Sequence, residues 1–119
     1  MSITLLVMSG CYKDKTVIIN KTLEVTRDVT FAADIAPIFS KSCAVSGCHA
    51  SGGHIPDLSA DKAFSALSLG GYLNTGSPET SELYLWLSGK KTTVMPVSGI
   101  NTDYNALVLA WIKQGAQNN

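Results

Sequence analysis

The stretch CAVSGCHASGGH, residues 43–54, places two cysteines and two histidines within twelve positions. The whole chain of 119 residues contains only three cysteines and two histidines, so most of its metal-binding side chains lie here. Three kinds of site use such a cluster: a zinc site, a disulfide and a covalently attached haem. Each requires a different subset of the four side chains.

A zinc ion would take four ligands, namely Cys43, Cys48, His49 and His54. Cys48 and His49 are adjacent, however, whereas zinc ligands are usually separated by about two to four residues. A disulfide between Cys43 and Cys48 would close a small loop and would suit an exported protein. Both remain alternatives, in which the chain is a zinc- or disulfide-stabilised interaction module without haem.

A covalent haem is attached through C-x-x-C-H, where two thiols add to the vinyl groups and the adjacent histidine binds the iron. Here Cys43-Ala-Val-Ser-Gly-Cys48-His49 is a widened form of that motif, with four residues between the cysteines. Small Ser46 and Gly47 let this loop bulge while the two sulfurs keep their separation. The adjacency of Cys48 and His49, unfavourable for zinc, is required for haem.

A six-coordinate haem needs a second axial ligand, and Met95 is the candidate. Met95 lies in the polar stretch TTVMPVSG, residues 92–99, where it belongs to no apolar stripe, and Pro96 stiffens the approach. His54 is too close to His49 in sequence to reach the opposite face of the ring easily. We therefore interpret His54 as a surface residue or as a residue beside the ligands.

Helical spacing of apolar residues predicts four helices with long loops and no convincing sheet. The first carries the stripe Phe31, Ile35, Ile38 and Phe39. Pro37 either bends this helix or places its start near Asp34. The others are predicted from Ser59 to about Leu67, from Ser77-Pro78-Glu79 to Gly89, and from Asn101 or Thr102 to Gly115. The last has the stripe Tyr104, Leu107, Val108, Trp111 and Ile112.

Composition limits the possible functions. A chain of this length makes one domain with one core. Nine basic and nine acidic residues cancel, which gives no case for nucleic-acid binding. No segment approaches the roughly 20 apolar residues of a membrane-spanning helix.

The N-terminus resembles a bacterial lipoprotein signal. An apolar run and two small residues precede Cys11, which would be acylated after residues 1–10 are removed. The alternative is an apolar strand with a buried Cys11. Residues 11–29 are then either a tether or a strand. The strand is suggested by Leu23, Val25 and Val29, which all occupy odd positions, as residues on one face of a strand do. The domain itself is expected to span residues 30–119.

The chain from about 29 to 116 resembles a class I cytochrome c domain. The matching pieces are FAADIAPIFSKSC before the attachment motif, the widened C-x₄-C-H motif itself, GSPETSELYLWL, the pair Met95-Pro96, and NALVLAWIKQGA at the end. The resemblance implies an all-α fold of about four helices, with long loops wrapped around one haem. Such long loops in a small helical domain are consistent with a bulky apolar cofactor at its centre.

The resemblance implies thioether bonds from Cys43 and Cys48 and axial ligation by His49 and Met95. It also implies a backbone carbonyl, supplied by Ile55-Pro56, that accepts the other ring N–H of the proximal histidine. The first and last helices should cross near the haem, with Phe39, Tyr104 and Trp111 as candidates for that contact.

With both axial positions filled, the expected function is one-electron transfer with redox partner proteins rather than catalysis. The alternative is a haem enzyme or gas sensor in which the distal ligand is displaced. The lipoprotein signal predicts an exported protein, in the periplasm or anchored to a membrane through Cys11.

Overall fold

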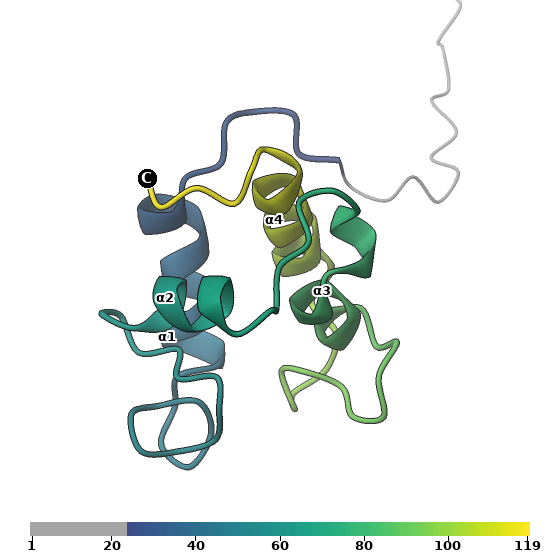
Figure 1. Ribbon diagram of the computed structural model, residues 1–119. Helices are drawn as coiled ribbons and strands as arrows, with labels where there is room; N and C mark the ends of the chain where they lie inside the picture. The colour runs from purple at the N-terminus through teal and green to yellow at the C-terminus, as the bar shows by residue number, and fades with distance from the viewer. Residues whose placement is uncertain (1–23) are drawn as a thin grey trace, which may run out of the picture.

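The computed structural model describes residues 24–119, which form helices and loops without a β-strand (Figure 1). The elements are η1 Phe31–Ile35, α1 Ala36–Ser42, α2 Ala63–Leu69, η2 Pro78–Thr80, α3 Glu82–Leu87 and α4 Thr102–Lys113. The predicted all-α class, with four α-helices and long loops, is confirmed for these residues. The proposed signal, residues 1–10, and Cys11 lie outside them.

The first helix begins at Phe31 and runs through Pro37 to Ser42, because η1 continues directly into α1. Thr30 caps it, since its hydroxyl accepts the Ala33 N–H. The first five residues form a wider π-helical turn. Proline lacks an N–H and crowds the preceding turn, and the wider turn makes room for it. The predicted stripe is confirmed, since all four of its apolar residues are buried.

Residues 24–29 form no strand and are held by the other end of the chain. The Gln114 side chain accepts the Val29 N–H at 2.8 Å and donates to the Arg27 carbonyl at 2.9 Å. Asn119 accepts the N–H groups of Phe31 and Ala32. These bonds fasten the start of the first helix to the segment that follows α4.

The last helix packs against η1 through aromatic rings, and of the three predicted contact residues Trp111 takes part, with Phe31 as its partner in place of Phe39 or Tyr104. The predicted position of this crossing near a haem stays a prediction. The ring centroids of Phe31 and Trp111 are 5.5 Å apart, and Phe64 of α2 completes the group. Asn101 caps α4 as predicted, because its side-chain oxygen accepts the N–H groups of Asp103 and Tyr104.

The predicted start of α2 at Ser59 is wrong. The Ser59 N–H and hydroxyl both donate to Asp57, while its carbonyl accepts from Lys62 and Ala63. Residues 59–62 therefore form a turn, and the helix starts at Ala63 and ends at Leu69. The competing side-chain bond to Asp57 explains the shift, since Ser and Asp readily hydrogen-bond nearby backbone.

The single helix predicted from Ser77 to Gly89 is divided in the structure. Pro78–Thr80 forms η2, Ser81 is extended, and α3 begins at Glu82. The buried Ser81 hydroxyl accepts the N–H of Asn74, and the Tyr72 carbonyl accepts the N–H of Leu83. These contacts with residues 72–74 hold Ser81 out of the helix.

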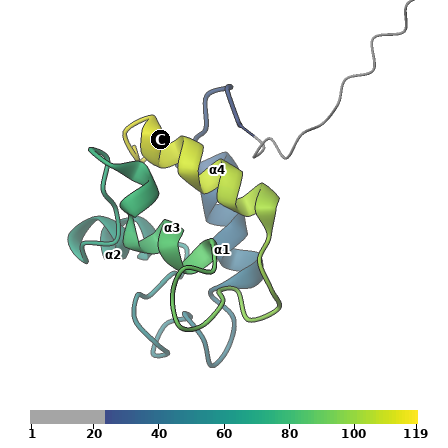
Figure 2. The same ribbon diagram turned by 90° about the vertical axis from the view of Figure 1, so that its right-hand side faces the viewer.

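Two long loops lie at one end of the molecule, away from residues 24–30 and the C-terminal segment (Figures 1 and 2). We call residues 43–58 the cysteine loop and residues 88–101 the methionine loop. The first leads from α1 toward α2, and the second connects α3 to α4. The fold thus places the two loops that carry the predicted ligands at a common end.

Candidate functional site

The cysteine loop begins where α1 ends, and backbone hydrogen bonds determine its shape. Cys43 still donates to Phe39, so its position is fixed by the last turn of the helix. The His49 N–H donates to the Cys43 carbonyl at 3.0 Å, and the His49 carbonyl accepts from Leu58 at 2.8 Å. The structure therefore brings the two ends of the predicted attachment motif together.

The imidazole of His49 is oriented by backbone carbonyls. Its Nδ1 atom lies 2.9 Å from the carbonyl oxygen of Pro56 and 3.2 Å from that of His54. A carbonyl oxygen only accepts, so Nδ1 carries a proton, and in the neutral imidazole Nε2 is then the nitrogen with the free lone pair. A metal-binding histidine has this arrangement, because the bond at one nitrogen fixes the tautomer and increases the basicity of the other.

His54 contributes its backbone rather than its ring. Its carbonyl is the second acceptor near His49 Nδ1, while its side chain is exposed. The interpretation of His54 as a residue beside the ligands is consistent with this position. Its N–H donates to the Cys48 carbonyl, which folds the loop back on the motif.

Gly53 allows that close approach, and the sequence analysis did not identify it. A Cβ atom at Gly53 would collide with the Cys48 carbonyl oxygen. Only glycine lets the chain pass so near to the carbonyl of the second cysteine. The signal in the sequence was the pair Gly52-Gly53, which stands just before His54.

Both cysteines of the motif are free thiols and half-buried. Burial, with repulsion from Cys48 as the smaller cause, raises the pKa of Cys43 to about 11. Cys43 is therefore a neutral thiol near neutral pH in this environment. Among residues 24–119, no three Cys, His, Asp or Glu side chains converge as a metal site would require, so the four zinc candidates are not assembled.

The methionine loop is anchored at both ends by asparagines of the α4 region. Asn105 donates to the carbonyl of Leu87, the last residue of α3, at 3.0 Å. Asn101 caps α4 at the other end of the loop. Between them, Met95 is half-buried and Pro96 is buried. Met95 thus lies on a loop with fixed ends, and this loop lies at the same end of the molecule as the cysteine loop (Figures 1 and 2).

Asn105 is also a buried polar residue that the sequence did not reveal, because it falls within an apolar helix. Its Oδ1 atom is buried and has no hydrogen-bond partner among the described residues. Buried acceptors of this kind are usually satisfied, often by ordered water. The residue therefore marks a polar position directly beneath the start of the methionine loop.

Exposed apolar side chains are concentrated on the two loops. Six large hydrophobic residues are exposed among those described, and Leu69 of α2 is the only one outside the loops. The other five are Val45, Ile55, Val94, Val97 and Ile100. Isolated exposed hydrophobics are ordinary, but a group at one end of a molecule indicates a bound group or a partner.

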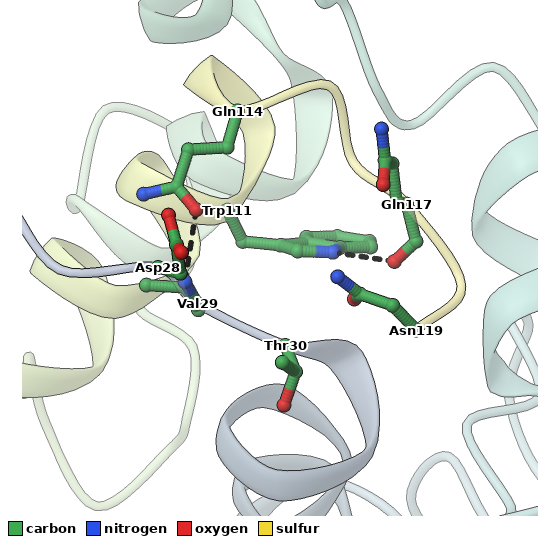
Figure 3. Close-up of a pocket in the computed structure, with 7 residues that line it drawn as sticks. All are labelled: Asp28, Val29, Thr30, Trp111, Gln114, Gln117 and Asn119. Atoms are coloured by element: carbon green, nitrogen blue, oxygen red, sulfur yellow. Dashed lines mark hydrogen bonds between the residues drawn. The ribbon is translucent and has the colours of Figure 1, made fainter.

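A separate hollow of about 510 Å³ lies at the opposite end of the molecule (Figure 3). It is lined by Asp28, Val29, Thr30, Trp111, Gln114, Gln117 and Asn119. Two of its polar side chains, Gln114 and Asn119, join the segment before the first helix to the C-terminal segment, and none of the predicted ligands lines it. We assign this hollow to the junction of the chain ends.

Comparison with protein-family models, with characterised proteins and with solved structures gives no match for this chain. Within residues 24–119, no helix has the length and apolarity needed to cross a membrane.

Proposed function

We propose that this protein is a one-electron carrier with a single covalently attached haem c. Cys43 and Cys48 would form the thioethers, His49 would be the proximal ligand and Met95 the distal ligand. The observation that carries the proposal is the 2.9 Å contact between His49 Nδ1 and the Pro56 carbonyl. It leaves Nε2 of His49 available to bind iron, and His49 directly follows Cys48, as the histidine follows the second cysteine in a haem attachment motif.

Three further observations fit this cofactor. Cys43 and Cys48 are both free thiols, which thioether formation requires. In that reaction each sulfur adds to one carbon of a vinyl group, and the thiol proton goes to the other carbon. The methionine loop, whose sequence contains the remaining predicted ligand Met95, lies at the same end of the molecule as the cysteine loop (Figure 2). Exposed apolar side chains of these loops would be covered in part by an apolar ring.

The residues of this chain would define the redox chemistry. A haem iron supplies the exchange of one electron between its ferric and ferrous states. The soft thioether sulfur of Met95 favours the ferrous state and raises the potential. The Pro56 carbonyl opposes this in part, since it increases the basicity of His49 and so stabilises the ferric state. With His49 and Met95 bound, no axial position is left for a substrate, which favours a carrier over an enzyme.

The test is an optical spectrum of protein matured in a host that exports proteins and attaches haem. We expect colour that survives acid–acetone extraction, an intact mass increased by one haem, and a low-spin reduced spectrum. The reduced protein should not bind carbon monoxide readily at neutral pH. A colourless protein from such a host would refute the proposal, and ready carbon monoxide binding would favour a sensor or haem enzyme.

We also propose that the protein is exported and anchored through a lipid on Cys11. The support is the sequence of residues 1–11. Intact mass of the membrane fraction should show loss of residues 1–10 and addition of acyl chains. Cys11→Ser should move the protein to the soluble fraction without changing the haem spectrum, which separates this proposal from the previous one.

A further inference from the structure

The end of the molecule formed by the two loops lacks formal charge. None of residues 42–56 and none of residues 92–102 is Asp, Glu, Lys or Arg, although 15% of the chain is charged. These stretches make up most of the cysteine and methionine loops. We call the two stretches together the uncharged end.

Two of the charged residues that border the uncharged end, Asp57 and Lys91, are paired within the chain, whereas Lys41 and Asp103, which also border it, form no ion pair among the described residues. Asp57 lies 3.7 Å from Lys62, and Glu82 lies 3.0 Å from Lys91. Each pair joins opposite charges at the border of a loop. The pairs therefore reduce the electrostatic field that the border would otherwise extend over the loops.

Part of this end would stay exposed after haem binding. The carbonyls of His54 and Pro56 both face Nδ1 of His49, so Ile55 between them lies on the Nδ1 side of the ring. A metal at Nε2 lies across the imidazole from it. Ile55 is 84% exposed, and haem on the Nε2 side leaves it uncovered.

We propose that the uncharged end docks a partner protein whose contacting surface is also uncharged and apolar. This inference rests on the proposed function, because the haem would be reached through this end. A charged partner group would lose hydration here without gaining an opposite charge, which disfavours a charged surface. Association is then driven by apolar burial and is not steered electrostatically, so its rate is insensitive to salt.

A second copy of the protein can serve as the partner in a test, because its own uncharged end is the kind of surface that the proposal requires. In electron self-exchange, an oxidised copy meets a reduced copy, and NMR line widths of mixtures give the rate. The polypeptide has no net formal charge, and the haem would add the same charge to wild type and to every variant, so a difference in salt dependence between variants reports charge near the contact. We expect the wild-type rate to change by less than about twofold from about 0.01 M to about 1 M salt.

Two lysine substitutions with the same change in net charge test the location. Ile55→Lys places like charges opposite each other in the encounter, and should slow exchange about threefold to fivefold at low salt, with recovery at high salt. Leu69→Lys is the control, because Leu69 is 89% exposed but lies on α2. It should leave the rate unchanged at every salt concentration.

Unchanged haem spectra would show that both variants are folded. A strongly salt-dependent wild-type rate, or equal effects of Ile55→Lys and Leu69→Lys, would overturn the docking proposal and leave the electron-carrier proposal standing. Protein without haem would overturn both. Thus the two proposals fail in different ways.

Discussion

The Nδ1 atom of His49 donates a hydrogen bond to the carbonyl oxygen of Pro56 at 2.9 Å, across a seven-residue separation in the chain. This contact joins the end of the attachment motif to the far side of the cysteine loop. It gives His49 a defined tautomer and a free Nε2. Because the acceptor is a backbone atom, the contact depends on the loop conformation rather than on the identity of a side chain.

His49→Ala should abolish the proximal ligand and strongly reduce haem incorporation and folded yield, because the cofactor would be a large part of the core. His54→Ala is the matched control, since only the His54 backbone contacts His49. It should incorporate haem normally. Haem content per protein, measured after extraction, compares the two. Equal incorporation in both variants would contradict ligation by His49.

Met95→Ala should retain covalent haem but lose the distal thioether. Without the soft sulfur ligand, we expect a lower reduction potential and a coordination position that carbon monoxide occupies in the reduced state. Val94→Ala, on the same loop, should keep the wild-type potential and spectrum. Redox titration and carbon monoxide binding are the measurements. A wild-type potential and spectrum in Met95→Ala would exclude Met95 as a ligand.

Asn105→Ala should lower the free energy of unfolding by about 1–3 kcal/mol, because it leaves the buried Leu87 carbonyl without its donor. Since that carbonyl lies at the start of the methionine loop, the loop should also exchange its amide protons faster. Asn118→Ala, at an exposed position, is the control. Denaturant titration and hydrogen exchange measure the two effects. Unchanged stability would mean that the Leu87 carbonyl finds another donor.

Asp34 should make the protein less stable in acid. The guanidinium of Arg27 is the main cause that lowers the pKa of Asp34 below its usual 3.8, and the Thr30 N–H adds to it. A carboxyl with a lowered folded pKa stabilises the fold above its unfolded pKa, and this contribution is lost as pH falls through the folded value.

Asp34→Ala should therefore be less stable than wild type by about 1 kcal/mol near neutral pH, mainly through the lost bond to the Thr30 N–H. The difference should begin to shrink below about pH 4. Asn118→Ala, which removes an exposed and uncharged side chain, is the control and should leave the pH profile of stability unchanged. Denaturant titrations across this pH range measure the difference. A constant difference down to the lowest pH would contradict the role of the Asp34 charge.

Gly53→Ala should impair haem attachment more than Ser51→Ala. The added methyl group would collide with the Cys48 carbonyl, so the loop would have to move away from the second cysteine. Ser51 is exposed and serves as the control in the same loop. The fraction of protein with extraction-resistant haem is the readout. Full attachment in Gly53→Ala would show that the loop shifts without disturbing the motif.

The sequence alone was sufficient for the helical class and for the first and last helices. Their apolar stripes and the Asn101 cap of the last helix are local features, and local hydrogen bonds are enough to express them. The Thr30 cap and the start of the first helix at Phe31 came from the structure, because Pro37 left that start open. The same is true of the ligand candidates, because adjacency of Cys48 and His49 is visible without a structure. The role of the haem itself stays a prediction.

Tertiary structure was needed wherever a distant partner competes with local preference. Ser81 is extended because Asn74 binds its hydroxyl, which divides a segment that local signals predict as one helix. Asn105 is buried because it reaches the end of α3, and its position in an apolar helix gives no sign of that contact. These bonds span seven and eighteen residues, beyond the roughly three or four residues over which periodicity and capping signals act. The packing of the helices also determines that the two loops lie at the same end of the molecule, because each loop starts and ends at the helices that flank it.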